Sequence, residues 1–288
     1  MHQVMLGDKR RLDAYDLALK RVLKPGDVVV DVGAGTLVLS LLALRRGASH
    51  VYAIEAEPDM AALALRIILV NGLRDRITLF QGDARSIRVP ERADVLVCEM
   101  MGNLGPEEQM AEIVEAAARR LLKPNGPILP ERLVTHIQAI GFDREGWGVW
   151  CEDFRGYSLR CVQDYAPPGA QLHFFSRPPV LLSAPRVVAD ASLGDMATQP
   201  GGHHRIAITK KGQLQAIAMY FTATLSVGVT LSNFPSYSGC NWAVWIWPVR
   251  HTKVAPGDVL HVEIRRPTQV RIATDWALDC RIEPGAEQ

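Results

Sequence analysis

Several features are scarce or missing in this chain of 288 residues, and each absence excludes a class of protein. The five cysteines include no pair at CxxC spacing, so no thiol-ligated metal is expected, and scattered thiols in odd number indicate reduced cysteines in a cytoplasmic protein. No apolar run approaches the ~18 residues of a membrane span, and the N-terminus lacks an apolar signal segment. The 32 basic and 31 acidic residues leave a net charge of +1, which argues against nucleic acid as a partner.

The first part of the chain alternates apolar strands with helices, a pattern typical of α/β domains. Strands are expected at 28–31, 50–54, 76–81 and 94–98. Helices are expected at 9–23, 37–46, 59–71 and 107–122. The alternation predicts a doubly wound, mostly parallel sheet with right-handed crossovers, which we place at residues 1–130.

Beyond this region the pattern changes to short β-branched and aromatic segments between proline and glycine turns. This texture predicts an all-β domain, a sandwich or a barrel, over 131–288. Strands are expected at 132–140, 186–189, 204–209, 215–225, 241–249, 259–265 and 269–274. A stretch of helical and loop character that contains Trp147 and Trp150 interrupts the β pattern, and we interpret residues 143–166 as an inserted arm.

A glycine turn, Gly33-Ala-Gly35, follows the first expected strand and opens the next helix. Small residues there let the backbone approach a ligand at the helix N-terminus. The second strand ends in Glu55, where a carboxylate can accept both hydroxyls of a ribose, and Asp83 after the third can bind the amino group of a base. Position 38 is valine, so the GxGxxG fingerprint is incomplete. The pattern resembles class I S-adenosylmethionine (SAM) methyltransferases more than NAD enzymes.

Two glutamates nine positions apart, Glu99 and Glu108, follow the fourth expected strand. One carboxylate at a strand end and a second on the returning loop form an acidic clamp. Such a clamp suits a guanidinium, which is planar, stays charged and offers five N–H donors. The alternative is that carboxylates at this point stabilise the first turn of a helix. We adopt that alternative for Glu107 and assign Glu108 to the clamp.

The chain resembles the protein arginine N-methyltransferases over nearly its whole length, and four segments carry the resemblance. They are residues 2–15, which fit H-x-x-M-L-x-D-x-x-R-x-x-x-Y, the glycine motif at 30–36, the double-glutamate loop from Glu99 to Glu108, and the proline junction at 128–132. The resemblance implies a seven-stranded, mostly parallel SAM-binding sheet, followed by a β-barrel-like domain. It also implies that the arm, with residues 150–157, docks on the SAM domain of a second copy in a homodimer.

The resemblance further implies roles for single residues. Arg11 would pair with the methionine carboxylate of SAM and Glu55 would bind its ribose, while Glu99 and Glu108 would hold the substrate guanidinium. The other residues assigned to the cofactor are His2, Met5, Asp31, Gly33, Gly35, Asp83 and Ala84, with Asp83 and Ala84 near the adenine. The other residues assigned to the reaction are Met101, Asn241 and Trp242, with Met5 and Met101 beside the path of the methyl group.

The chain departs from the family pattern in two places. The family's Thr-His-Trp in the barrel is Cys240-Asn241-Trp242 here, so an asparagine replaces a histidine. Met100 and Asn103 stand where the double-glutamate loop usually has aromatic residues. These changes favour a substrate unlike the usual protein tails, so free arginine or an arginine-derived metabolite is considered beside peptidyl arginine.

We therefore predict a SAM-dependent N-methyltransferase that acts on a guanidino nitrogen of arginine. One alternative is a small-molecule N- or O-methyltransferase of a biosynthetic pathway on the same scaffold, which would be indifferent to guanidines. Another is a non-catalytic SAM-binding dimer partner, which would bind SAM without turnover. No metal is expected, and we place His203 and His204 in a polar loop.

Overall fold

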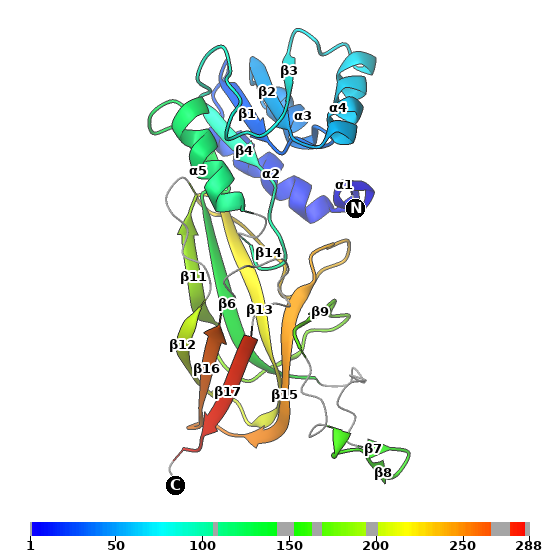
Figure 1. The fold of residues 1–288 in the computed structure, drawn as a ribbon, viewed down its shortest axis with the longest axis vertical. Helices are drawn as coiled ribbons and strands as arrows, with labels where there is room; N and C mark the ends of the chain where they lie inside the picture. The colour runs from blue at the N-terminus through cyan, green and yellow to red at the C-terminus, as the bar shows by residue number, and fades with distance from the viewer. Residues whose placement is uncertain are drawn as a thin grey trace.

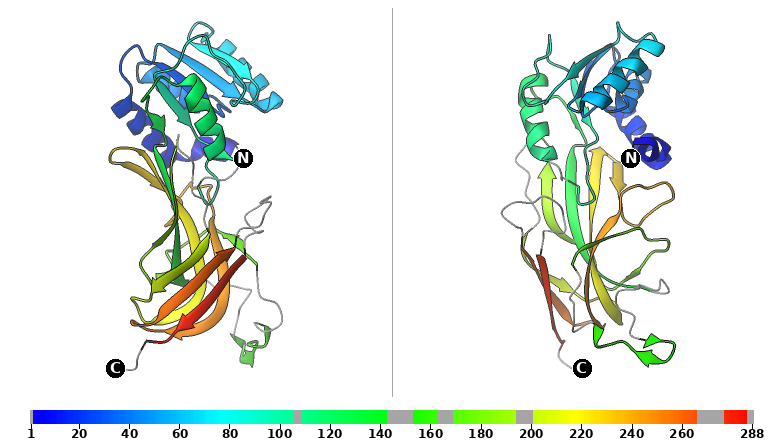
Figure 2. Two further views of the ribbon diagram at one scale, coloured as in Figure 1. Left: turned by 60° about the vertical axis from the view of Figure 1, so that its left-hand side comes forward. Right: turned by 45° about the vertical axis from the view of Figure 1, so that its right-hand side comes forward.

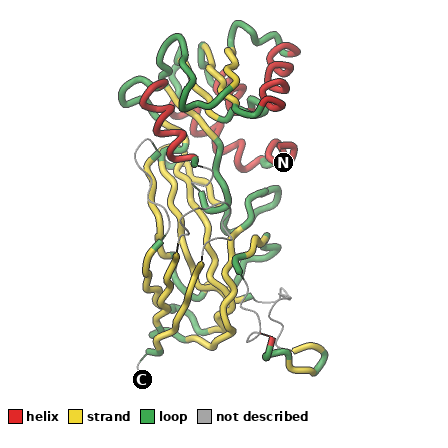
Figure 3. The backbone as a smooth tube through the Cα atoms, in the orientation of Figure 1, coloured by secondary structure: helices red, strands yellow, loops and turns green. Residues whose placement is uncertain are grey.

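The computed structural model describes residues 2–105, 109–142, 153–162, 169–193, 201–265 and 277–285. Figure 1 shows an α/β unit from the N-terminal part of the chain above an elongated β unit, with the C-terminus at the far end. The tube drawing in Figure 3 shows that the helices gather in the first unit and the long strands in the second. Within the described ranges, no helix is long and apolar enough to cross a membrane.

The α/β unit is built on a parallel five-stranded sheet. Its strands are β1 (Val28–Val32), β2 (His50–Glu55), β3 (Ile77–Gln81), β4 (Val95–Cys98) and β5 (Ile128–Leu129), in the order β3-β2-β1-β4-β5. Its helices are α1 (His2–Gly7), α2 (Lys9–Val22), α3 (Val38–Arg45), α4 (Pro58–Val70) and α5 (Met110–Leu121). Figure 2 shows α4 and α5 on opposite faces of the sheet. Covering both faces explains why β1 and β4 are uniformly buried and, apart from Asp31, apolar.

The predicted fold class is confirmed, with a difference in the number of strands. The parallel sheet has five strands in the described residues rather than seven. The chain leaves the sheet after β5, because β6 (Arg132–Gly141) pairs with β13 (Gly212–Ser226) of the β unit. The eight helices and strands expected in the first part are all present, and α1 and β5 are additions. Residues 106–108, including Glu108, lie outside the described residues.

The β unit consists of two antiparallel sheets. The larger contains β6 and β13 together with β9 (Gln171–His173), β10 (Val180–Leu181), β11 (Arg186–Ser192), β14 (Val229–Ser232) and β15 (Val244–Val254). The smaller contains β12 (Gly202–Ala207), β16 (Val259–Arg265) and β17 (Ala277–Glu283). The two sheets share a core that includes Ile217, Trp247 and Leu260. Trp245 and Trp247 are also buried in this core.

Some expectations for the β unit were wrong. His203 and His204 lie on β12 rather than in a loop, because this segment pairs with β16. The described part of the arm, 153–162, contains a β-hairpin that was not expected, β7 (Asp153–Phe154) and β8 (Tyr157–Ser158), beside turns and a helical residue, Val162. This hairpin extends away from the sheets in Figure 1. Trp147, Trp150 and the strand expected at 269–274 lie outside the described residues.

The two units share buried contacts. Phe221 and Trp242 of the β unit belong to the same apolar cluster as Tyr15, Leu96 and Met101 of the α/β unit. The rings of Phe221 and Trp242 pack edge to face, with their centroids 5.1 Å apart. The carboxyl edge of β1 and β4 therefore lies against the β unit, and both units can contribute to a site there.

Candidate active site

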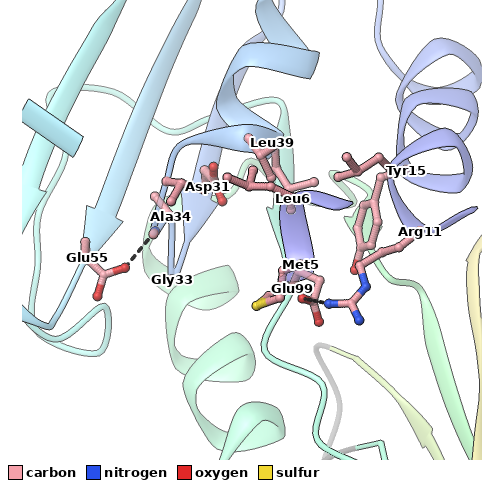
Figure 4. A pocket seen from close by; sticks show the side chains of 14 residues that line it. Met5, Leu6, Arg11, Tyr15, Asp31, Gly33, Ala34, Leu39, Glu55 and Glu99 are labelled. Carbon is pink, nitrogen blue, oxygen red and sulfur yellow. Dashed lines mark hydrogen bonds and ion pairs between the residues drawn. The ribbon is translucent and has the colours of Figure 1, made fainter. Parts of the chain in front are cut away.

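A cavity of about 610 Å³, part of it open to solvent, lies at the carboxyl edge of the parallel sheet. Ligands of open α/β sheets bind at this edge. Figure 4 shows strand ends on one side of the cavity and the side chains of α1 and α2 on the other. The cavity is lined by seven of the residues assigned from the sequence: Met5, Arg11, Asp31, Gly33, Gly35, Glu55 and Glu99.

Other assigned residues lie outside the lining of this cavity. Asp83 follows β3 as expected, but its carboxylate accepts a 2.7 Å hydrogen bond from Arg85, and the neighbouring Ala84 is buried. Met101, Asn241 and Trp242 lie behind the cavity wall, where they contact residues that do line it. His2 belongs to α1, and its side chain is outside the described part of the structure.

The ribose candidate, Glu55, is held by the backbone. Gly35 N–H donates to its Oε2 at 2.7 Å and Glu57 N–H donates to its Oε1 at 2.9 Å. Each carboxylate oxygen can accept a further hydrogen bond, so Glu55 keeps capacity for two hydroxyls. The turn beside it requires a glycine, since Gly33 has φ +73° and a Cβ there would lie 3.0 Å from Met100 Cγ. Sequence reasoning recorded Met100 only as a departure from the family and missed this contact.

Asp31 lines the cavity and has one buried, unpaired carboxylate oxygen. Its Oδ2 accepts hydrogen bonds from Ser40 N–H at 3.0 Å and Ser40 Oγ at 2.6 Å. Its Oδ1 is buried and has no hydrogen-bond partner among the described residues. Burial raises the pKa of Asp31 to about 6, against the opposing effect of the Ser40 hydrogen bonds. An orphaned carboxylate oxygen on a cavity wall is a place for a donor or a cation of the ligand.

Glu99 is held by a guanidinium. Arg11 Nη1 donates to Glu99 Oε2 at 2.8 Å, and Met101 N–H donates to Glu99 Oε1 at 3.2 Å. Burial raises the pKa of Glu99, whereas the charge of Arg11 lowers it. Only 3% of the Arg11 side chain is exposed. Arg11, which the resemblance assigned to the carboxylate of SAM, is thus already engaged with Glu99, which the resemblance assigned to the substrate guanidinium.

The Cys240-Asn241-Trp242 segment completes the surroundings of Arg11. Asn241 Oδ1 accepts a hydrogen bond from Arg11 Nη2. The indole of Trp242 lies 3.4 Å from Arg11 Cζ, and its Nε1–H donates to the Met101 carbonyl at 2.9 Å. A guanidinium over an indole face is a favourable cation–π pair. Asn241 and Trp242 therefore act on the site through Arg11 and Met101.

The loop after β4 is attached to the β unit by hydrogen bonds that sequence reasoning missed. Thr135 Oγ1 donates to the Leu104 carbonyl at 2.8 Å, and Asn233 Nδ2 donates to the Asn103 carbonyl at 2.9 Å. Asn103 Oδ1 accepts in turn from Ala243 N–H at 2.9 Å. In the sequence, Thr135 and Asn233 stand out only as polar residues within apolar segments. Such a pattern does not reveal which group each side chain will bond. These bonds set the path of the chain that leaves Glu99.

Comparison with known proteins now identifies the family. Residues 29–126 match a family described as methyltransferase domain. Protein arginine N-methyltransferase 6 of Danio rerio is 30% identical over 260 residues, which make up 84% of this chain and 74% of the relative. The chain belongs to the protein arginine N-methyltransferase family. It is a SAM-dependent methyltransferase, as the sequence motifs implied.

Other relatives extend this comparison. An arginine N(omega)-methyltransferase of Streptomyces achromogenes subsp. streptozoticus is 29% identical over 276 residues, which cover 91% of this chain and 75% of the relative. Protein arginine N-methyltransferase 2 of Dictyostelium discoideum matches over a shorter stretch, 50% of this chain and 28% of the relative, at 40% identity. The fold is shared with Arabidopsis thaliana protein arginine methyltransferase 10 at a TM-score of 0.80, with 21% identity over 98% of this chain and 93% of that one.

The described residues fit SAM. The glycine turn leaves the backbone open at the cavity, and Glu55 can receive the ribose hydroxyls. The unpaired Asp31 Oδ1 offers an anion to a cationic ligand. When bound, SAM supplies an electrophilic methyl group on a sulfonium.

Proposed function

We propose that this chain methylates a guanidino nitrogen of arginine and that free arginine is the preferred substrate. The observation that carries the proposal is Glu99, a buried carboxylate on the cavity whose resident partner is itself a guanidinium. Carboxylate–guanidinium pairs combine charge with directed hydrogen bonds. A carboxylate that already holds one guanidinium has the chemistry to hold another.

The charges around Arg11 support a cationic substrate. Asp8 and Glu99 both lie within ion-pair distance of Arg11, at 3.3 and 2.8 Å. Two carboxylates and one guanidinium leave one negative charge in a buried place, and Glu108 would add another. Isolated charges are costly to bury, so a bound guanidinium is stabilised by balancing them.

The two glutamates would orient the substrate guanidinium, and their negative charge would stabilise the transition state. Glu99 and Glu108 would fix the guanidinium so that one nitrogen faces the methyl group to be transferred. Positioning of two reactants can supply ~7–11 kcal/mol of a barrier. The carboxylates also draw positive charge away from the attacking nitrogen and stabilise the cationic transition state. A glutamate or a water molecule accepts the proton that the methylated nitrogen releases.

The preference for free arginine rests on two observations. The Streptomyces relative, which matches 91% of this chain, is named for arginine and not for protein arginine. The chain also carries Asn241, Met100 and Asn103 where the family pattern has a histidine and aromatic residues. Asn241 contacts Arg11 directly, Met100 follows Glu99 in the chain, and Asn103 is bonded to Ala243, two residues after Asn241.

We also infer that the chain forms a homodimer, with the arm of one copy on the α/β unit of the other. Exposed apolar side chains on α4 support this arrangement. On that helix Leu65 is 47% exposed, Leu69 40% and Val70 81%. Several exposed apolar side chains on one helix are typical of interaction surfaces.

The decisive assay is methyl transfer from labelled SAM to free L-arginine and to an Arg-Gly-rich peptide, with products identified by mass. Methylation of arginine supports the proposal in full. Methylation of the peptide alone overturns the preference for free arginine. If SAM binds and neither guanidine is methylated, the guanidine proposal fails. Glu108→Gln should lower turnover far more than SAM affinity, and equal losses would assign Glu108 to structure.

A further inference from the structure

Another cavity lies on the α/β unit, where the connection from β3 to β4 passes the C-terminal end of α5. It has a volume of about 610 Å³, part of it open to solvent. We call it the arginine cavity, and it is lined by Ile87, Arg88, Val89, Arg92, Arg119, Arg120 and Leu121. Its described lining contains four arginines and no acidic residue, and it shares no residue with the described lining of the cavity at the carboxyl edge.

The arginines come from two separate segments of the chain. Residues 82–94 join β3 to β4 without a helix, although a crossover between parallel strands usually contains one. This connection supplies Arg88 and Arg92, whereas Arg119 and Arg120 belong to the last turn of α5. The fold thus brings four guanidinium groups to one hollow.

Backbone carbonyls hold two of the guanidinium groups. Nη2 of Arg120 donates to the carbonyls of Ser86 and Ile87 at 2.9 and 3.0 Å, and its Nη1 donates to the carbonyl that precedes them. Nη1 of Arg92 donates to the Leu122 carbonyl at 3.4 Å. Since a carbonyl group is neutral, these bonds place the guanidinium groups and leave their charge unbalanced.

Carboxylates balance only part of the positive charge. Arg119 pairs with Glu115 of the same helix at 2.5 Å, whereas Arg88, Arg92 and Arg120 form no ion pair with a carboxylate in the described ranges. Cations in the last turn of a helix stabilise its dipole, which gives Arg119 and Arg120 a structural role. That role does not extend to the two arginines of the loop. Like charges repel each other, and a bound anion would offset this repulsion.

Acidic residues near the cavity in the sequence are engaged elsewhere or lie outside the lining. Asp83 pairs with Arg85 at 2.7 Å, and Asp94 pairs with Lys123 at 2.6 Å. Glu91 is exposed and is absent from the described lining. The arginine cavity is therefore a local excess of positive charge in a chain whose net charge is +1.

We propose that the arginine cavity binds a small molecule that carries a phosphate group. The phosphate would lie on the three guanidinium groups that lack a carboxylate partner, because the planar fork of arginine matches the oxygens of phosphate. The organic part would pack on the apolar residues of the lining, Ile87, Val89 and Leu121. This inference goes beyond the proposed function and does not depend on which group is methylated.

The test is calorimetric titration with phenyl phosphate, at constant ionic strength set by chloride. The double variant Arg88→Gln/Arg92→Gln should bind phenyl phosphate about tenfold or more weakly than the wild type, because it loses hydrogen bonds to a charged group. The matched control is Arg66→Gln/Arg74→Gln, which removes two exposed arginines at α4 and gives the same net charge. Equal losses in the two variants would indicate diffuse attraction and overturn the proposal.

Comparison with inorganic phosphate tests the apolar part of the site. Phenyl phosphate should bind about threefold or more tightly, since its ring removes apolar surface from water. Equal affinities would overturn the assignment of an organic ligand. Unchanged SAM affinity of the double variant checks that it is folded.

A titration with SAM present separates the two cavities. Phenyl phosphate should still bind to the SAM-saturated protein, because the described linings do not overlap. Displacement by SAM would place the phosphate at the carboxyl edge and overturn the proposal. A protein that binds phenyl phosphate through Arg88 and Arg92 and methylates no guanidine supports this inference and overturns the proposed function alone.

Discussion

Asp31 gives the site a pH dependence with a defined sign. Burial raises its pKa to about 6 in the folded protein, so below that pH the side chain is mostly neutral. A cationic ligand prefers the anion, and binding at low pH must first remove a proton. We expect SAM affinity to be constant above pH 6 and to fall by about tenfold per pH unit well below it. Isothermal titration calorimetry across this range measures the effect.

Asp31→Asn provides the control for this prediction. Asparagine retains an acceptor for Ser40 but cannot ionise. SAM affinity of the variant should be weaker than that of the wild type above pH 6 and should lose its dependence on pH. A wild-type affinity that stays flat between pH 4 and pH 7, given the pKa of about 6, would show that Asp31 does not face the cation.

Glu99 forms a structural ion pair with Arg11 and is also the residue proposed to bind the substrate, so its substitution should have two consequences. Glu99→Gln should lower kcat/KM for the guanidine by about 100-fold or more, because the lost charge faces the transition state. It should also destabilise the fold by about 3 kcal/mol, since buried Arg11 loses a carboxylate partner. Urea unfolding and initial rates measure the two effects. Glu112→Gln, an exposed carboxylate on α5, is the control, and equal rates in the two variants would exclude the assigned role.

Elements differ in how far their sequences determine them. In the α/β unit, each strand and helix is defined by local periodicity and by a turn of glycine, proline or asparagine, so the expected ranges agree with the observed ones. In the β unit, β13 pairs with both β6 and β15, and its register with β15 shifts between Leu214 and Ala216. Such long-range pairing and irregularity leave no local pattern. The short strands β9, β10 and β14 were missed for this reason.

Residues of the candidate site also divide into those that the local sequence predicts and those whose contacts depend on long-range folding. Glu55 and Glu99 could be assigned from the sequence, because each ends a strand at one edge of a parallel sheet. The contacts of Arg11 with Asn241 and Trp242 join positions more than 200 residues apart in the chain. Thr135 and Asn233 act through backbone carbonyls, and nothing in a sequence specifies which carbonyl a side chain will reach.

Asn233 is one of the side chains that hold the loop after β4 in place. Asn233 is fully buried and bonds Phe221 N–H, the Asn103 carbonyl and the Ala243 carbonyl. Asn233→Ala leaves these groups unpaired and should cost about 2–5 kcal/mol in unfolding free energy. It should also lower kcat, because the chain after Glu99 loses its attachment.

Gln138→Ala is a matched control for this prediction, since Gln138 is a buried amide that bonds Ser183 and Tyr220 away from the loop. Urea unfolding and steady-state kinetics at a temperature where both variants are folded make the comparison. A similar stability loss in both variants, with kcat reduced only in Asn233→Ala, supports the attachment. Equal kcat values would contradict it.

At the scale of the whole molecule, the proposed homodimer would make α4 part of an interface. Val70→Glu places a charge on a side chain that is 81% exposed in one copy and buried in the proposed dimer. We expect the variant to be monomeric by size-exclusion chromatography with light scattering, at a concentration where the wild type is a dimer. Val227→Glu is the control, because Val227 is 84% exposed on the β unit. A Val70→Glu dimer as stable as the control would place the interface elsewhere.

The guanidinium of Arg11 against Glu99 has a consequence for how this protein is handled. Guanidinium chloride, a common denaturant, delivers the reactive end of the proposed substrate without its chain. At concentrations below those that unfold the protein, the ion would compete for the glutamates as a ligand. A ligand that binds only the folded state raises apparent stability. Linear extrapolation of unfolding in guanidinium chloride would therefore start from a liganded protein, whereas neutral urea reports the unliganded one.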